Sequence, residues 1–260
     1  MKIGMVGLGR MGMNMARRFL RGGHPVAAFN RTPAKTRELM QEGAEGCFSL
    51  AELVEKLPPP RVVWLMLPAG AVTDEHVEDL RGLLEPGDLI VEGGNSHFRD
   101  DLARAAALKP SGIRYLDAGI SGGIWGLQEG YCTMVGGEAA DFACLEPVLR
   151  TLAPEAGYLH CGPVGAGHYV KMIHNAIEYG MMEAYGEGFA LLEASPYRDH
   201  LDFQALASLW NRGSVVRSWL LELLEKAFAA DPRLTGISGY VEDSGEGRWS
   251  VDEAVANGVA

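Results

Sequence analysis

The sequence has few cysteines and no long hydrophobic run. Its four cysteines, which form no CxxC pair, predict ordinary packing residues of a reduced, cytoplasmic protein, with one disulfide pair as the alternative: Cys47, Cys132, Cys144 and Cys161. The longest apolar stretch, around residues 62–72, is far shorter than the roughly 20 residues that a membrane span needs. The N-terminus has no basic segment followed by an apolar one, so we expect neither a signal peptide nor a membrane partner.

Basic side chains are also scarce. The 23 lysines and arginines face 34 aspartates and glutamates, which gives a net charge of −11. This balance argues against nucleic acid or an acidic membrane as the main partner, while a local basic pocket stays open. The hydrophobic fraction of 47% over 260 residues is enough for a sizeable core in one or two domains.

Short apolar segments alternate with helical patterns in the first 160 residues. Strands are predicted at 2–7, 25–30, 61–67, 88–94 and 114–121, and helices at 12–22, 34–43 and 98–108. Most of the strands are continuously apolar, as expected where both faces of a sheet are covered. The alternation predicts an α/β fold with a doubly wound parallel sheet.

The pattern changes after the glycine and proline cluster at 162–167. One long helix is predicted from 166 to about 194, and further helical segments at 202–230. We therefore expect a dinucleotide-binding domain at 1–163 and an all-helical domain for substrate and oligomerisation at 164–260. The last nine residues look like the start of a helix, so we expect the natural chain to be longer. The long helix has more apolar surface than its own domain can cover, which predicts a homo-oligomer, a dimer or tetramer, packed through that domain.

A GxGxxG pattern links the first predicted strand to the first helix. Gly7 allows a tight turn, Gly9 lets the backbone approach a pyrophosphate, and Gly12 permits close packing of helix on strand. The helix N-terminus then offers amide groups to the phosphates. The pattern predicts a Rossmann-type dinucleotide site; the alternative is a glycine-rich turn in a domain that binds no nucleotide.

The end of the second predicted strand bears on the choice of dinucleotide. An acidic residue there would repel a 2′-phosphate, but this sequence has Asn30, Arg31 and Thr32. A guanidinium can bind a phosphate in bidentate fashion. The segment favours NADP, with NAD possible if Arg31 only stacks on the adenine.

The stretch KMIHNAIEYG places four polar side chains on one face of the long helix. Lys171, His174, Asn175 and Glu178 follow the spacing i, i+3, i+4 and i+7. A lysine can act as general base when a secondary alcohol is oxidised, and in its protonated form it can polarise the ketone of a β-keto acid that loses CO₂. An acid two turns along can protonate the resulting enediol. The alternative is a solvated helix face with a histidine packed in the core.

These motifs together resemble one family. GLGRMG, FNRT, EGGNS, SGG followed by MVGG, and GAGHYVKMIHNAIEYG are similar to the decarboxylating 6-phosphogluconate dehydrogenases, in the short-form subfamily of the β-hydroxyacid dehydrogenases. The resemblance covers nearly the whole chain. It implies oxidation of 6-phosphogluconate, a small phosphorylated sugar acid, to ribulose 5-phosphate and CO₂ with hydride transfer to NADP or NAD, in the pentose phosphate pathway and gluconate metabolism.

The resemblance also implies roles for single residues. Lys171 would be the general base and Glu178 the general acid, and no metal is needed. The substrate would be held by Asn95, Ser121, Gly122, Gly123, His174, Asn175, Tyr179, Arg248 and Ser250. The dinucleotide would be held by Gly7, Leu8, Gly9, Arg10, Met11, Gly12, Asn30, Arg31, Thr32, Leu67, Pro68 and Asn95.

Several positions depart from the long-form enzymes. Ile124 and Trp125 stand where those enzymes usually have acidic residues, and Pro68 stands where many have a lysine. The short forms often use NAD, which opposes the argument from Arg31. The C-terminal arginine and histidine that long forms lend to a neighbouring subunit are missing here, which leaves the phosphate site the least defined.

Two rival functions remain. One is a β-hydroxyacid dehydrogenase that acts on a small unphosphorylated acid without decarboxylation and has no need of an acid at Glu178. The more distant one is a non-catalytic dinucleotide sensor, which should keep its binding after a Lys171→Ala substitution.

Overall fold

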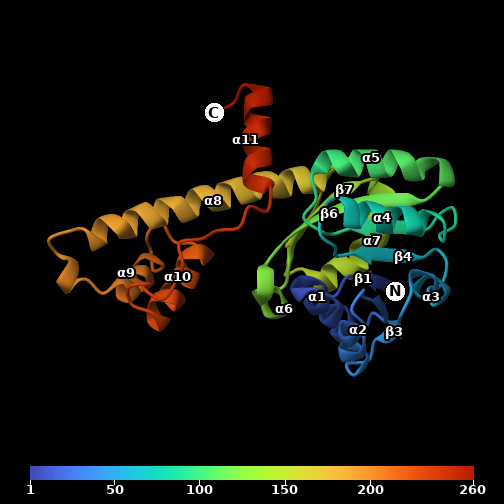
Figure 1. Ribbon diagram of the computed structural model, residues 1–260, viewed down its shortest axis with the longest axis horizontal. Coiled ribbons are helices and arrows are strands. Elements are labelled where there is room, and N and C mark those ends of the chain that lie inside the picture. The colour runs from blue at the N-terminus through green and yellow to red at the C-terminus, as the bar shows by residue number, and fades with distance from the viewer. The chain divides into compact units, whose positions relative to one another are not determined.

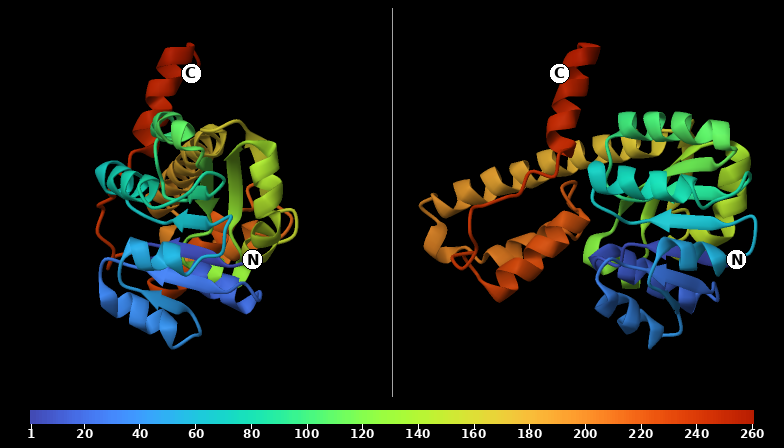
Figure 2. Two further views of the ribbon diagram at one scale, coloured as in Figure 1. Left: turned by 90° about the vertical axis from the view of Figure 1, so that its right-hand side faces the viewer. Right: turned by 45° about the vertical axis from the view of Figure 1, so that its right-hand side comes forward.

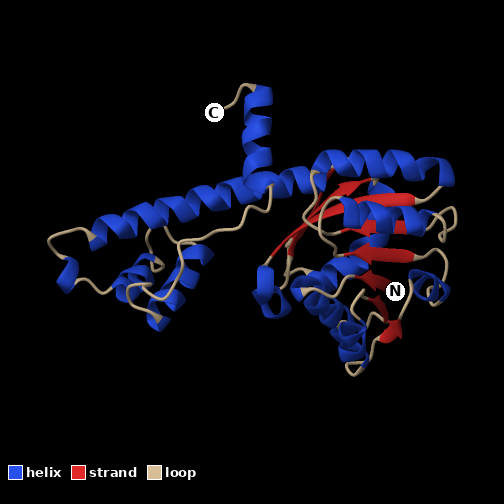
Figure 3. Ribbon diagram, in the orientation of Figure 1, coloured by secondary structure: helices blue, strands red, loops and turns tan.

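The computed structural model describes residues 1–260, which form two compact units, Met1–Met172 and Ile173–Ala260 (Figure 1). The first unit is built around a sheet and the second is made of helices (Figure 3). This composition confirms the predicted α/β fold with an all-helical C-terminal part.

The sheet of the first unit has eight strands in the order β3-β2-β1-β4-β5-β6-β7-β8. All neighbouring strands are parallel except the antiparallel pair β6 and β7. The five predicted strands are present, and β3, β7 and β8 were not predicted. The bounds are β1 (Ile3–Val6), β2 (Val26–Phe29), β3 (Glu45–Cys47), β4 (Val62–Leu65), β5 (Leu89–Glu92), β6 (Arg114–Ser121), β7 (Cys132–Gly137) and β8 (Tyr158–Gly162).

Helices cover both faces of this sheet, as the left view of Figure 2 shows. On one face α1 (Arg10–Arg21) and α7 (Ala139–Leu152) enclose an apolar core. On the other face α3 (Leu50–Glu55), α4 (Ala71–Arg81) and α5 (Phe98–Leu108) enclose a second core. Every residue of β1, β4 and β5 is buried, which explains why these strands are apolar throughout except for Glu92 at the end of β5. The short helices α2 (Pro33–Met40) and α6 (Gly126–Glu129) complete the unit.

Helix α8 (Ala166–Glu193) is continuous over 28 residues and belongs to both units. Its bounds confirm the long helix that was predicted from 166 to about 194. The expected domain boundary at 163 lies just after the end of β8, whereas the compact units divide after Met172. The difference arises because the first two turns of α8 pack on the sheet. The assignment of a binding role to each domain stays a prediction.

The second unit combines the rest of α8 with α9 (Phe203–Trp210), α10 (Trp219–Ala230) and α11 (Glu246–Asn257). Phe189 of α8 packs against Phe203 and Phe228 in a small aromatic core. The expectation that the last nine residues start a helix was wrong. They contain the last turns of α11, which ends at Asn257 and is followed by the capping residue Gly258 with a φ of 63°.

None of the helices combines the length and the apolar character that crossing a lipid bilayer requires. The four cysteines are all free thiols, but only Cys47 is buried, whereas Cys132 and Cys144 are exposed, so the packing role expected for all four was wrong for these two.

Candidate active site

The predicted site residues of the first unit gather at one edge of the sheet. The neighbouring strands β2, β1, β4, β5 and β6 are parallel, so their carboxyl ends lie along the same edge. The predicted residues follow these ends: Gly7–Gly12 after β1, Asn30, Arg31 and Thr32 after β2, Leu67 and Pro68 after β4, Asn95 after β5, and Ser121, Gly122 and Gly123 at the end of β6. The order also reverses between β1 and β4, and such a switch point is where open α/β sheets bind ligands.

The glycine loop has the geometry that close approach of a phosphate requires. Gly7 has a φ of +94°, and a Cβ there would lie 2.3 Å from the carbonyl oxygen of Met66. A Cβ at Gly12 would lie 2.1 Å from the carbonyl oxygen of Gly7, so α1 can start against β1 only without it. Gly9 faces open space, with no atom within 4 Å of a built Cβ. The exposed Arg10 and half-buried Met11 then open α1.

Asn30 connects the glycine loop to the loop after β2. Its Oδ1 accepts a hydrogen bond from the backbone N–H of Leu8 at 2.8 Å, and its Nδ2 donates to the carbonyl oxygen of Thr32 at 3.1 Å. The side chains of Arg31 and Thr32 are exposed. Asn30 therefore orders both loops, while Arg31 is accessible to a ligand.

The first turns of α8 lie unusually close to the sheet. A Cβ at Gly119 of β6 would be 2.3 Å from the Cβ of Lys171, and a Cβ at Gly167 of α8 would be 2.5 Å from the carbonyl oxygen of Met134. Lys171 is only 8% exposed. Because these two glycines have no side chains, α8 can approach the sheet closely enough for Lys171 to pack against β6, which ends at Ser121.

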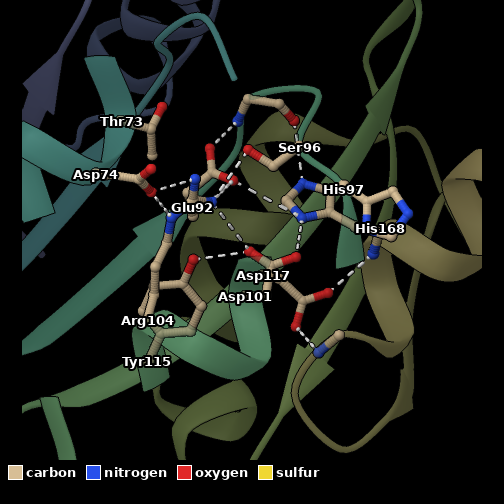
Figure 4. A network of polar contacts seen from close by, with 12 residues as sticks. Thr73, Asp74, Glu92, Ser96, His97, Asp101, Arg104, Tyr115, Asp117 and His168 are labelled. Atoms are coloured by element: carbon tan, nitrogen blue, oxygen red, sulfur yellow. Dashed lines mark hydrogen bonds and ion pairs between the residues drawn. The ribbon is translucent and has the colours of Figure 1, made fainter. Parts of the chain in front are cut away.

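A buried carboxylate holds the start of α8. Asp117 of β6 accepts hydrogen bonds from the backbone N–H groups of Gly165 at 2.7 Å and His168 at 2.8 Å (Figure 4). These amides have no partner within the helix, so the carboxylate satisfies them and complements the positive end of the helix dipole. Burial raises the pKa of Asp117, against the opposing effects of His168 and these amides.

His168 lies at the centre of the network in Figure 4. Its Nδ1 is 2.7 Å from Oδ2 of Asp101 on α5, and its Nε2 is 3.0 Å from the carbonyl oxygen of Gly94. Burial alone would lower the pKa of His168, but the charges of Asp101, Glu92 and Asp117 outweigh it and raise the pKa to about 10. The ring is therefore an imidazolium at neutral pH.

Glu92 and Arg104 complete the network. Glu92 ends β5 and accepts a hydrogen bond from the N–H of Gly94 at 2.7 Å, which orders the loop that carries Asn95. Arg104 donates to Asp74 at 2.8 Å and to Ser96 at 3.2 Å. Burial raises the pKa of Glu92, although His168 and Arg104 oppose this rise.

Glu92, Asp101 and His168 also bring ligand-type atoms within 4.8 Å of one another. These residues do not fit a metal ion. The Arg104 guanidinium lies 3.5 Å from Glu92 and 3.7 Å from Asp101, and both ring nitrogens of His168 already face acceptors. The cations that balance these carboxylates are thus side chains.

The second unit contains the other predicted residues of the α8 face. His174 Nδ1 lies 3.7 Å from Glu178 and 3.0 Å from Oδ1 of Asn175. Asn175 Nδ2 donates to the buried Glu246 of α11 at 3.0 Å. The four polar residues share one continuous helix, as predicted, and Glu246 was not predicted.

The residues predicted for phosphate have different surroundings. The hydroxyl of Tyr179 is 3.4 Å from that of Ser244, and an open hollow beside it is also lined by Glu242 and Asp243. Arg248 is exposed and pairs with Asp243 at 3.0 Å. Ser250 donates to the carbonyl oxygen of Glu246 at 2.7 Å. Arg248 would have to exchange Asp243 for a phosphate in order to bind one.

Sequence reasoning missed the buried network behind the loops. Two signals were available: Glu92 stands at the end of an otherwise apolar strand, and Asp117 lies inside another. His168 also precedes Lys171 by three residues, on the same face of α8. A charged group in a strand that is buried on both faces needs partners, which is the clue that these residues provided.

Comparison with known proteins gives a consistent picture over the whole chain. Residues 2–162 match the family described as the NAD binding domain of 6-phosphogluconate dehydrogenase, and residues 167–260 match its C-terminal domain. A Bacillus subtilis protein, provisionally named 6-phosphogluconate dehydrogenase, is 47% identical over 98% of this chain and 85% of its own length. The NAD⁺-dependent, decarboxylating 6-phosphogluconate dehydrogenase of Haloferax volcanii is 43% identical over 98% of this chain and 84% of its own length.

Solved structures show the same fold. The Plasmodium falciparum 6-phosphogluconate dehydrogenase, which has been solved alone, with NADP⁺ and with 6-phosphogluconate, matches all of this chain with a TM-score of 0.89 and 30% identity. This chain spans 59% of that longer protein. A 3-hydroxyisobutyrate dehydrogenase of Salmonella typhimurium matches with a TM-score of 0.82 and 26% identity, over 88% of its length.

Proposed function

This chain belongs to the 6-phosphogluconate dehydrogenase family, and from that premise we propose that it oxidises and decarboxylates 6-phosphogluconate to ribulose 5-phosphate and CO₂ with an NAD(P) cofactor. The observation that supports this most is the position of Lys171. This lysine of α8 is nearly buried and packs against β6, the strand that ends at Ser121. It lies in the unit that carries the glycine loop.

The proposed reaction uses two side chains of α8. Neutral Lys171 would take the proton of the substrate hydroxyl, and a dinucleotide held at the glycine loop would supply the acceptor for the hydride that leaves the carbon bearing that hydroxyl. Protonated Lys171 then donates a hydrogen bond to the ketone oxygen of the β-keto acid. The bond to the carboxylate breaks, CO₂ leaves, and the electron pair forms an enediol whose negative charge the lysine stabilises. Glu178 gives its proton to the terminal carbon, which yields the ketone product.

The remaining predicted residues are proposed to bind rather than to react. The residues that would hold the substrate are Asn95, Ser121, Gly122, Gly123, His174, Asn175, Tyr179, Arg248 and Ser250. Residues 1–163 would thus serve mainly for the dinucleotide, and residues 164–260 for substrate and assembly.

The cofactor preference is proposed to be NADP. Relatives of both kinds exist, since Bacillus subtilis has one 33% identical relative named as NADP⁺-dependent and one 34% identical relative named as NAD⁺-dependent. Arg31, exposed beside the glycine loop and facing solvent, supports the proposal because its guanidinium can bind a 2′-phosphate.

A homo-oligomer is proposed through the helical unit. Apolar side chains that remain exposed there include Ile177 at 60%, Leu191 at 74% and Val255 at 77%. Several such residues on helices with a small core indicate a surface that a second copy covers. Sedimentation equilibrium of the full chain at several concentrations tests this, and a monomer at all of them would disprove it. The four free cysteines fit a reducing compartment, and we propose the cytoplasm.

The decisive experiment follows reduced-nicotinamide absorbance and CO₂ release together, with 6-phosphogluconate and either NADP⁺ or NAD⁺. Equal amounts of reduced cofactor and CO₂ are expected. Reduction without CO₂ release would favour a non-decarboxylating dehydrogenase. In that case no enediol would form, and Glu178 would have no proton to deliver. The absence of reduction with both cofactors, from a folded protein that binds dinucleotide, would favour the sensor.

A further inference from the structure

Three segments that the proposed reaction needs meet at His168. The ring donates towards Gly94, the residue before Asn95, and towards Asp101 of α5. Its own backbone N–H donates to Asp117, on the strand that ends at Ser121. His168 also precedes Lys171 by three residues, which is about one helical turn.

We propose that His168 is a positioning residue for this reaction, which fixes the loop of Asn95 against the helix that carries Lys171. The inference deepens the proposed function and rests on it for the meaning of an activity measurement. His168 is 2% exposed, so it touches no substrate and acts only through its neighbours.

With Asp101 as a carboxylate, the two hydrogen bonds of the ring require that both of its nitrogens carry a proton. The carbonyl oxygen of Gly94 can only accept, so Nε2 must carry a proton. Asp101 already accepts a hydrogen bond from the hydroxyl of Tyr115 at 2.8 Å, and its second oxygen faces Nδ1 at 2.7 Å. Only an imidazolium ring can donate to the Gly94 carbonyl and to the Asp101 carboxylate at once. The rigid five-membered ring also fixes the angle between these two hydrogen bonds.

A buried network of charges is not an efficient way to stabilise a loop, compared with apolar packing of the same volume. Buried ion pairs often contribute no more to stability than apolar side chains of the same volume, whereas removal of one partner is strongly destabilising. Their directional bonds do fix geometry. The Gly94 peptide is held on both sides, because its N–H donates to Glu92 and its carbonyl accepts from His168. Little freedom is left to Asn95, the next residue.

The test compares His168→Gln and Asp101→Asn with a matched control, Asp88→Asn. Asp88 is also a buried carboxylate paired with an arginine, Arg61, at 2.9 Å, but it precedes β5 and lies at the opposite end of that strand from the Asn95 loop. We expect kcat to fall about 100-fold in His168→Gln, since a misplacement of about 1 Å can have this effect. The affinity for the dinucleotide alone should fall much less than kcat, because Asn95 is the only residue predicted to hold the dinucleotide that belongs to the loop fixed by this network.

Asp88→Asn should lower the unfolding midpoint and leave kcat unchanged. The double variant His168→Gln/Asp101→Asn should lose no more kcat than the worse single variant, since both act as one unit. If His168→Gln lowers only the unfolding midpoint, as Asp88→Asn does, the positioning role is wrong.

Amide hydrogen exchange provides a readout that does not depend on turnover. The segment 93–97 should exchange about tenfold faster in His168→Gln, in line with a loss of roughly 1.4 kcal/mol of local protection, and remain unchanged in Asp88→Asn. Unchanged exchange there would overturn the inference. If the unmodified chain does not turn over 6-phosphogluconate, the proposed function fails, but this exchange experiment still decides whether His168 anchors the loop.

Discussion

Lys171 lies directly over the backbone of Gly119, so that a methyl group on Gly119 would be 2.3 Å from the Cβ of Lys171. The pairing explains how a lysine can be nearly buried and still start at the sheet surface. The Cβ of Lys171, on α8, lies over Gly119 of β6, two residues before that strand ends at Ser121. Any side chain at position 119 would have to displace the helix that carries the proposed base.

Gly119→Ala should therefore reduce kcat and destabilise the first unit by about 1–3 kcal/mol, the usual effect of overpacking. Gly180→Ala, on helix α8, is the control, because no atom lies within 4 Å of a Cβ built at Gly180. That substitution should stabilise the protein by about 0.5–1 kcal/mol, since glycine is a poor helix former. Urea unfolding and steady-state kinetics measure both. Equal stability of the two variants would contradict the close packing of α8 on β6.

Lys171→Met removes the amine and keeps the length of the side chain. We expect kcat/KM to fall by a factor of about 10²–10⁴, the range for loss of a general base, with dinucleotide affinity unchanged. Lys109→Met, at an exposed lysine outside the site, should leave the kinetics as they are. A Lys171→Met enzyme with more than about a tenth of normal activity would exclude Lys171 as the base.

Glu178→Gln keeps the size of the side chain but cannot give a proton to the enediol. A fall in kcat of about 100-fold is expected, within the range for general acid catalysis. The matched control is Glu183→Gln, at an exposed glutamate of the same helix, and it should have normal kinetics. Solvent-derived deuterium in the product offers a second measurement, because its stereochemical purity should fall when Glu178 no longer delivers the proton. Full stereochemical purity in the variant would argue for another acid.

Arg31→Ala tests the proposed preference for NADP. Loss of a charged hydrogen bond, worth about 1.5–3 kcal/mol, should lower kcat/KM for NADP⁺ by about 10–100-fold, whereas that for NAD⁺ should change little. Arg37→Ala is the control, because Arg37 stacks on the ring of Phe48 and carries the same charge on nearby α2. Parallel losses with both cofactors would mean that Arg31 stacks on the adenine.

Stability should fall as the pH rises above neutrality. The pKa of His168 is raised from 6.5 to about 10, so the folded protein holds a proton that the unfolded chain releases. This contribution is fully present below about pH 6.5 and is lost as the pH rises through about 10, with a slope of up to about 1.4 kcal/mol per pH unit for one proton. The charges that act on the ring are those of Asp101, Glu92 and Asp117. Arg104 contacts Glu92 and Asp101, and Tyr115 donates to Asp101.

Burial also raises the pKa values of Glu92 and Asp117, which adds to the same trend with the same sign. Urea unfolding at several pH values between about 7 and 9.5 should show the decline, and His168→Gln should flatten it. An equally steep decline in that variant would place the proton elsewhere.

Local sequence patterns predicted the framework of this protein well. Gly7 and Gly12 could be assigned because a turn with positive φ and a helix packed on a strand each exclude a Cβ. The long helix was predictable because its periodicity extends over many turns. The strands β3 and β7 were missed because β3 has three residues and β7 includes two glycines, which leaves little pattern to detect. The roles of the site residues stay predictions until the variants above are measured.

The sequence by itself determined that a strand, a glycine turn and a helix open an α/β fold, and that Lys171, His174, Asn175 and Glu178 share one helix face. These features depend on residues close together in the chain, whose spacing fixes their geometry. Only the tertiary structure decided what supports them. Glu92, Asp101, Asp117 and His168 come from two strands and two helices, and no local periodicity relates them. They meet because buried charges must find partners when the sheet and its helices close around them.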